Sequence, residues 1–232
     1  MVSLAAAPAM LPAVDAREAA ARAAAELVSA GMTIGLGSGR AVWATIAHLP
    51  RGTRAVAASE RTREVAHEAG IEVLDLDGSF ELDLALDGAD EVDPELRLIK
   101  GGGGALLREK IVISAARRFV VVAEAAKRVE RLGETFRLPV EVVRFGWRDT
   151  RRRLAALLPD AEQRLREDGE AYLTDEGHFI LDCAIPATAD IDALDAAIKQ
   201  VPGVMEHGLF IGMAERALLG REDGSVEVLE GS

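Results

Sequence analysis

The stretch from Leu82 to Ala116 constrains the fold of this chain more than any other. It begins with leucines that alternate with acidic or small residues, which is typical of a β-strand, and Asp87-Gly88 marks a turn. Four consecutive glycines, residues 101–104, then precede a second apolar segment. This order predicts a strand, a loop and a helix, the unit from which α/β folds are built.

Two carboxylates, Asp87 and Asp90, follow the end of this predicted strand. Ligand crevices of open α/β sheets form at the carboxyl ends of strands, so both residues are candidates for chemistry. Asp is also common in turns, and together with Glu91 and Asp93 the two residues are equally compatible with a solvated acidic loop.

A helix after the glycines would turn Glu109 towards the protein interior. At the helical period, the residues within roughly 60° of Glu109 are apolar: Ala105, Leu106, Val112, Ile113 and Ala116. A buried carboxylate is costly unless it is paired, and such groups are frequent at active sites. A structural ion pair, for example with Lys100, would explain the same burial. A strand over residues 111–113 would remove this geometry.

Lys100 directly precedes the glycine run. Glycines let a ligand approach the backbone closely, and N–H groups at the start of a helix are free to bind an anion. Flexible turns contain glycine runs as well, so the run alone does not define a site.

The segment DGADEVDPELRLIKGGGGALLREKIV resembles the signature of the type A ribose-5-phosphate isomerases, and the resemblance extends over nearly all of the chain after the first dozen or so residues. It places Asp87, Asp90, Lys100 and Glu109 on the active-site positions of that family. It implies interconversion of D-ribose 5-phosphate and D-ribulose 5-phosphate through an enediolate, without a cofactor, in the non-oxidative pentose phosphate pathway. Glu109 would move the proton, Lys100 would stabilise the enediolate oxygen, and the aspartates would assist ring opening.

A second glycine-rich loop, GLGSGR at residues 35–40, lies between a predicted buried strand and a helix over residues 41–49. Such a loop suits an anion, and the missing third glycine disfavours a dinucleotide cofactor. By the resemblance, the sugar phosphate would be bound by Gly37, Ser38, Gly39, Arg40, Gly101, Gly102, Gly103 and Lys127.

The chain departs from the family pattern at Arg40, Ala41, Ala123 and Ala126, where relatives usually carry hydroxyl or acidic residues. An arginine can bind a phosphate through two charge-assisted hydrogen bonds. Arg40 could equally indicate a different substrate or be an exposed side chain without a role.

The remaining segments alternate predicted strands and helices, which indicates an α/β fold with a mostly parallel, Rossmann-like open sheet and helices on both faces. Asp15 and Glu18 form a possible capping box for a helix that ends near residue 30. Strand, turn and strand over residues 171–182, followed by a helix, predict a smaller α+β lobe. The expected domains are a main one of residues 15–137 and 208–232 and a small one of residues 138–207, after a flexible extension of residues 1–14.

Composition excludes several other classes of protein. The net charge of −12 disfavours nucleic-acid binding, and no apolar run is long enough to span a membrane. The single cysteine, Cys183, and four scattered histidines provide no metal-ligand spacing, so no metal is expected. The N-terminus lacks the basic residues with which a secretory signal begins. Ser59 and Thr62 could line the pocket, or they could cap the helix that follows them. A cytoplasmic homodimer or homotetramer is expected from the resemblance.

Two other functions remain open from the sequence. One is an isomerase of the same mechanism that acts on another phosphorylated sugar or sugar acid. The other is a non-enzymatic sugar-phosphate sensor, since regulators of the DeoR type use a related fold. Such regulators normally carry an N-terminal helix-turn-helix domain, for which no room is expected before Met32.

Overall fold

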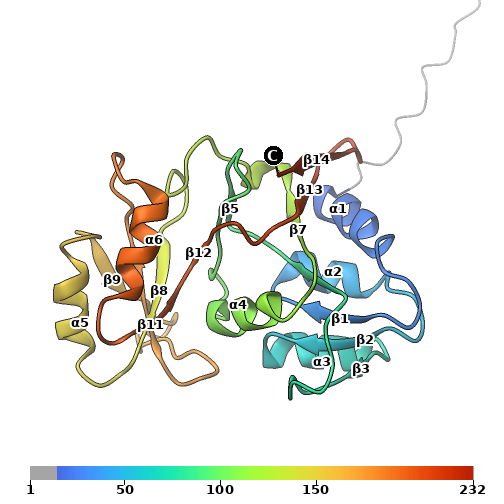
Figure 1. The fold of residues 1–232 in the computed structure, drawn as a ribbon, viewed down its shortest axis with the longest axis horizontal. Coiled ribbons are helices and arrows are strands. Elements are labelled where there is room, and N and C mark those ends of the chain that lie inside the picture. The colour runs from blue at the N-terminus through green and yellow to red at the C-terminus, as the bar shows by residue number, and fades with distance from the viewer. Residues whose placement is uncertain (1–14, 232) are drawn as a thin grey trace, which may run out of the picture.

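The largest sheet has seven strands in the computed structural model, which describes residues 15–231 (Figure 1). The order is β14-β13-β7-β4-β1-β2-β3, with bounds β1 Thr33–Leu36, β2 Arg54–Ala57, β3 Glu72–Val73, β4 Leu84–Asp87, β7 Phe119–Glu124, β13 Arg216–Gly220 and β14 Val226–Glu230. Neighbouring strands run parallel, except for the antiparallel edge pair β13 and β14. The predicted mostly parallel α/β sheet is therefore confirmed.

The strand order reverses between β1 and β4. From β1 the chain adds β2 and β3 on one side, and from β4 it adds β7, β13 and β14 on the other. In open α/β sheets a crevice forms at the carboxyl ends of the strands that flank such a reversal. The loops that directly follow β1 and β4 therefore border the expected crevice.

Helices cover both faces of this sheet, as predicted. The helices α1 (Ala16–Ala25), α2 (Arg40–Ile46) and α3 (Glu60–Glu68) pack against one face, where their apolar side chains share a core with Ile34, Leu36 and Val120. Helix α4 (Leu106–Ser114) lies on the other face. Successive residues of a strand point to opposite faces, so Gly35 faces away from the side chains of Ile34 and Leu36, and Val112 of α4 packs against it there. A side chain at Gly35 would collide with Val112, so the glycine permits this close approach.

Helix α1 begins as predicted but ends earlier. The Asp15 side chain accepts a hydrogen bond from the N–H of Arg17 at 2.9 Å and caps the helix. Glu18 does not complete the capping box, because its carboxylate binds Arg22 and His48 instead. The helix ends at Ala25 rather than near residue 30, because the N–H groups of Leu27 and Val28 bond three residues back and tighten the chain into turns.

A second sheet is antiparallel and has the order β11-β8-β10-β9. Its strands are β8 (Leu138–Val142), β9 (Ala161–Gln163), β10 (Phe179–Cys183) and β11 (Val204–His207), and it shares a core with α5 (Trp147–Leu154) and α6 (Ile191–Lys199). Figure 1 shows these elements gathered on one side of the molecule. We propose that this small lobe, residues 138–207, is one domain and that the rest of residues 15–231, the main body, is the other.

A short sheet, β12-β6-β5, lies between the small lobe and the large sheet (Figure 1). It consists of β5 (Glu91–Val92), β6 (Leu98–Ile99) and β12 (Leu209–Phe210). The buried Glu91 carboxylate accepts hydrogen bonds from the N–H groups of Gly133, Thr135 and Phe136, in the segment that leads into β8. Glu91 thus fixes the entry to the small lobe and is not part of a solvated loop.

The predicted strand over residues 171–173 is wrong. Ala171 makes an isolated bridge with Leu165, and β10 pairs instead with β8 and β9. The reason is that this segment turns towards the main body, where the Tyr172 hydroxyl binds the carbonyl of Gly103.

The ends of the other predicted helices and strands agree with the structure to within a few residues. The predicted extension of residues 1–14 lies outside the described part of the chain.

Candidate active site

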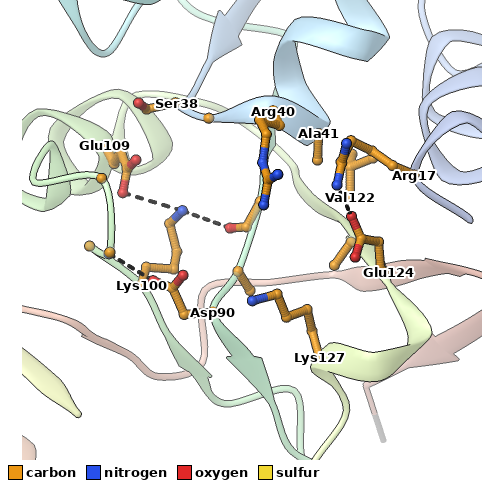
Figure 2. Close-up of a pocket in the computed structure, with 17 residues that line it drawn as sticks. Arg17, Ser38, Arg40, Ala41, Asp90, Lys100, Glu109, Val122, Glu124 and Lys127 are labelled. Atoms are coloured by element: carbon orange, nitrogen blue, oxygen red, sulfur yellow. Dashed lines mark hydrogen bonds and ion pairs between the residues drawn. The ribbon is translucent and has the colours of Figure 1, made fainter. Parts of the chain in front are cut away.

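A pocket of about 270 Å³ lies where the order of the large sheet reverses (Figure 2). Its walls come from the loops after β1 and β4, the glycine run, α4 and the end of β7. The lining residues are Arg17, Ser38, Gly39, Arg40, Ala41, Gly88, Ala89, Asp90, Lys100, Gly101, Gly102, Gly103, Glu109, Val122, Ala123, Glu124 and Lys127. The fold therefore brings the predicted catalytic and phosphate-binding residues together, and all of them line the pocket except Gly37 and Asp87, of which Asp87 contacts Lys100.

Lys100 is buried between two carboxylates. Its Nζ lies 2.8 Å from Oδ2 of Asp87 and 3.3 Å from Oε2 of Glu109, and it donates to the Gly88 carbonyl at 2.7 Å. Burial alone would lower the pKa of Lys100, but the charges of Asp87 and Glu109 raise it above its ordinary value. The side chain is therefore a fixed positive charge in the pocket.

Glu109 holds its proton more tightly than an ordinary glutamate does. Burial, reinforced by the charge of Asp87, raises the pKa of Glu109 to about 8, against the opposing effect of Lys100. One ammonium cannot neutralise two carboxylates, and within residues 15–231 no hydrogen bond donor satisfies Oε2 of Glu109. The carboxyl can therefore take up and release a proton near neutral pH, as a general base must.

Helix α4 aims Glu109 inwards, as its apolar periodicity predicts. Leu106, Val112 and Ile113 are buried on the same face, whereas Ile111 is 51% exposed. Residues 111–113 are helical, so the alternative strand is excluded.

Asp87 lies behind Lys100 and does not line the pocket. Its Oδ1 accepts hydrogen bonds from the N–H groups of Ser38 at 3.1 Å and Gly88 at 2.7 Å. Burial raises the pKa of Asp87, and the Lys100 charge and these two N–H groups oppose that rise. A Cβ on Gly37 would overlap the carboxylate, so Gly37 serves this packing rather than the pocket surface. Asp87 thus ties both loops to Lys100.

Asp90 lines the pocket and connects it to the glycine run. Its Oδ2 accepts a hydrogen bond from the N–H of Gly102 at 2.8 Å (Figure 2). A side chain at Gly102 would press on this carboxylate and on Phe136, and Gly101 has φ of +105°, which only glycine adopts without strain. These contacts explain the glycines at positions 101 and 102.

Arg40 and Lys127 both line the pocket, as do Ser38 and Gly39, the two residues that precede Arg40. Arg40 begins α2 and is exposed, and its side chain extends into the pocket in Figure 2. Lys127 ends a short 3₁₀-helix, Ala125–Lys127, after β7. Two cations from separate segments therefore face one cavity.

Sequence reasoning missed a third cation, Arg17 of α1. Its guanidinium pairs with Glu124 at the end of β7, and both side chains line the pocket (Figure 2). Gly220 of β13 allows this approach, because a Cβ there would strike the Ala16 carbonyl. No local pattern marks Arg17, which lies 107 residues before its partner.

Ser59 and Thr62 do not line the pocket. The Ser59 hydroxyl accepts from the N–H of Thr62 and caps α3, and the Thr62 hydroxyl accepts from the indole of Trp43. The capping alternative is therefore correct for this pair.

Neither a metal cluster nor a membrane-spanning helix is found among residues 15–231. No three His, Cys, Asp or Glu side chains of this part of the chain are arranged to hold a metal ion. No helix within the same range is both long and apolar enough to cross a membrane.

Comparison with known proteins identifies relatives over most of the chain. Residues 54–224 match the family model of ribose 5-phosphate isomerase A (phosphoriboisomerase A). Ribose-5-phosphate isomerase A of Roseiflexus castenholzii is 50% identical, with 91% of this chain and 94% of the relative covered. The structure of ribose 5-phosphate isomerase A from Methanocaldococcus jannaschii has a TM-score of 0.87 at 34% identity, covering 93% of this chain and 98% of that one. A D-ribose-5-phosphate isomerase in complex with phospho-erythronic acid has a TM-score of 0.89 at 31% identity, covering 95% and 100%.

Proposed function

Because the chain belongs to the ribose 5-phosphate isomerase A family, we infer that it interconverts D-ribose 5-phosphate and D-ribulose 5-phosphate. The observation that carries this conclusion is the buried Glu109, with its raised pKa, beside Lys100 in the pocket. Relatives that share half of the residues bear the same name, so a different sugar substrate or a sensor without activity is not favoured.

We propose that Glu109 moves the proton in this reaction. In the open-chain sugar the Glu109 carboxylate would take the proton from C2, and the electron pair of that C–H bond would form an enediolate with its charge on O1. A proton would then pass from the C2 hydroxyl to O1, and the protonated carboxyl would return the carbon-bound proton to C1, which leaves a hydroxyl on C1 and the ketone at C2. A group with a pKa near the working pH is suited to both steps.

Lys100 would stabilise the negative oxygen of the enediolate. The ammonium is already desolvated and held by Asp87 and Gly88, so little reorganisation is required as charge develops. Asp90, which lines the pocket, would assist ring opening by exchanging a proton with a sugar hydroxyl. We propose that Asp87 contributes by orienting Lys100, since it lies behind the pocket surface.

Arg40, Lys127 and Arg17 would bind the phosphate of the substrate. All three line the pocket, and arginine can bind a phosphate with two charge-assisted hydrogen bonds. Ser38, Gly39 and the glycines 101–103 would contribute further donors. The departure at Arg40 would then replace hydroxyl ligands by a charged one and keep the substrate.

The compartment, the pathway, the oligomeric state and the lack of a cofactor are proposed from the family to which the chain belongs. We propose that the protein acts in the cytoplasm, in the non-oxidative pentose phosphate pathway, as a homodimer or homotetramer and without a cofactor. The absence of metal-ligand spacing in the sequence supports the last point.

Turnover of a panel of sugar phosphates by the purified protein, with a metal chelator present, tests the proposal. We expect the highest kcat/KM for D-ribose 5-phosphate. D-Ribose, which lacks the phosphate, should be at least about 100-fold poorer, because phosphate binding energy is lost in the transition state. Faster turnover of another sugar phosphate, or none by a folded protein, would overturn the assignment.

A further inference from the structure

The carbonyl groups of the glycine run are held by the small lobe. Nη1 of Arg164 donates to the carbonyl of Gly101 at 2.9 Å and to that of Gly102 at 3.1 Å. The Tyr172 hydroxyl donates to the carbonyl of Gly103 at 3.0 Å. Neither Arg164 nor Tyr172 lines the pocket, so the three carbonyls are bound from outside it.

Arg164 is itself fixed in place. Its Nε and Nη2 both donate to the Asp182 carboxylate in β10, a bidentate geometry that leaves Nη1 directed at the main body. The side chains of Arg164 and Asp182 are 13% and 23% exposed, so the pair is largely shielded from water. A planar guanidinium with five donors can bind both oxygens of a carboxylate and two carbonyls at once, whereas the ammonium of a lysine has only three donors.

A run of four glycines requires such bracing. Glycine has the largest backbone freedom of any residue, and Gly101 and Gly104 adopt φ of +105° and +84°. A rotated peptide in the run would turn a carbonyl oxygen towards the pocket, where it would repel the oxygens of a bound anion. Holding the carbonyls from outside keeps their oxygens away from the pocket.

Two N–H groups of the run are bonded within the protein, and that of Gly103 is not. Gly102 donates to Asp90 at 2.8 Å, and Gly104 donates to the Gly101 carbonyl at 3.0 Å. No acceptor among the described residues takes the N–H of Gly103, which lines the pocket and is therefore free to bind a substrate oxygen.

We propose that Arg164 is a positioning residue for the isomerase reaction, which acts by holding the glycine run so that the Gly103 N–H, and Asp90 with it, face the substrate. The small lobe would thus contribute to catalysis without touching the substrate. This inference rests on the proposed function, because it assumes that the pocket binds a sugar phosphate.

Steady-state kinetics of Arg164→Met, Tyr172→Phe and Arg166→Met test the proposal. Arg166 is the matched control, since it lies two residues away and pairs with Asp168 on the surface without contacting the run. We expect Arg164→Met to lower kcat/KM about 10- to 100-fold, because Asp90 and the donor of the run would no longer be held in place against the substrate. Tyr172→Phe should lower kcat about two- to tenfold, the effect of one hydrogen bond. Arg166→Met should stay within about twofold of wild type, as surface substitutions do.

Amide hydrogen exchange in residues 101–104 provides a readout that needs no turnover. Arg164→Met should speed exchange of the Gly102 and Gly104 amides, while the core strand β7 stays as protected as in wild type; Arg166→Met should change neither. Unchanged exchange in the run, or equal kinetics of the Arg164 and Arg166 variants, would overturn the inference. An inactive wild type would refute the proposed function instead, and the exchange result would still decide the role of Arg164.

Discussion

Glu109 owes its proposed role to a shortage of positive charge around it. Asp87 has Lys100 Nζ, at 2.8 Å, and two backbone N–H groups as partners. Among the described residues, the cation that pairs with Glu109 is the same Nζ, which lies 3.3 Å from Oε2. These contacts favour the ionised form of Asp87 more than that of Glu109, while burial raises the pKa of both carboxyl groups. The same arrangement makes activity and stability depend on pH in opposite directions.

Activity should rise with pH through the raised pKa of Glu109. Only the ionised carboxylate can take a proton from carbon, so kcat/KM is expected to increase from pH 6 and level off above about 8. The pH profile of kcat/KM for ribose 5-phosphate checks this, with a variant outside the pocket, Arg51→Ala, as control. A profile that is flat from pH 6 to 9 would contradict the role of Glu109 as base.

Stability should change in the opposite sense. The folded pKa of about 8 lies above the ordinary value of 4.5, so the contribution of Glu109 is fully present below pH 4.5 and is lost as pH rises through about 8. Relative to Glu109→Gln, which cannot ionise, wild type should lose unfolding free energy over this range. Urea unfolding of both proteins at several pH values measures the difference. If the unfolding free energies of the two proteins changed with pH in parallel, the pKa of Glu109 would not be raised to about 8.

Arg40 stands where relatives usually carry a hydroxyl residue, and its substitution tests whether it binds the phosphate instead. Arg40→Ala should raise KM for ribose 5-phosphate about tenfold, since a charge-assisted hydrogen bond contributes about 1.5–3 kcal/mol and Arg40 is partly solvated. Arg51→Ala removes another exposed arginine, away from the pocket, and should leave KM unchanged. Equal KM values for the two variants would show that Arg40 does not bind the phosphate.

At the scale of elements, α4 contributes side chains in two directions. Glu109 faces the pocket, and the next residue, Lys110, reaches the chain that returns from the small lobe. Its Nζ bonds Glu206 and the carbonyls of His207 and Leu209, each at 2.8 Å. Lys110 therefore anchors the helix that carries the proposed base.

Removing Lys110 should destabilise the protein strongly. Lys110→Met leaves the largely buried Glu206 carboxylate with Lys199 as its remaining cation, and breaking a buried ion pair typically costs about 3 kcal/mol or more. Lys199→Met is the control: this lysine is 44% exposed, so its loss should cost less than about 1 kcal/mol. Chemical denaturation measures both, and equal losses would contradict an anchoring role for Lys110.

The sequence predicted those elements whose pattern is local. The apolar period of α4 and the buried run of β1 are properties of a few neighbouring residues, so both elements and the inward side of Glu109 could be inferred. The segment before residue 174 follows no such pattern, because its backbone is fixed by contacts of Arg164 and Tyr172 with another part of the chain.

At the scale of the whole molecule, contacts between distant segments account for what the sequence could not predict. Strand and helix alternation indicated a parallel sheet, and the resemblance to a family supplied the set of candidate residues. Neither indicated that Arg17 of α1 lies against Glu124, or that Asp87 lies behind Lys100 rather than on the pocket surface. Such facts depend on how complete elements pack.

The reversal of strand order explains why residues from so many segments meet. Loops after β1 and β4 diverge at this point, which leaves room for the glycine run and α4 to close the cavity from the opposite face. The small lobe then holds the run from outside. Every residue that lines the pocket, however, belongs to the main body.

The most direct test of the account is conversion of ribose 5-phosphate in D₂O by wild type and Glu109→Gln, followed by NMR. Wild type should form ribulose 5-phosphate and incorporate deuterium at carbon, because the carboxyl that carries the proton exchanges with solvent. Glu109→Gln should fold normally and slow both processes at least about 100-fold, the typical contribution of a positioned base. Conversion by this variant at close to the wild-type rate would contradict the central claim that Glu109 moves the proton.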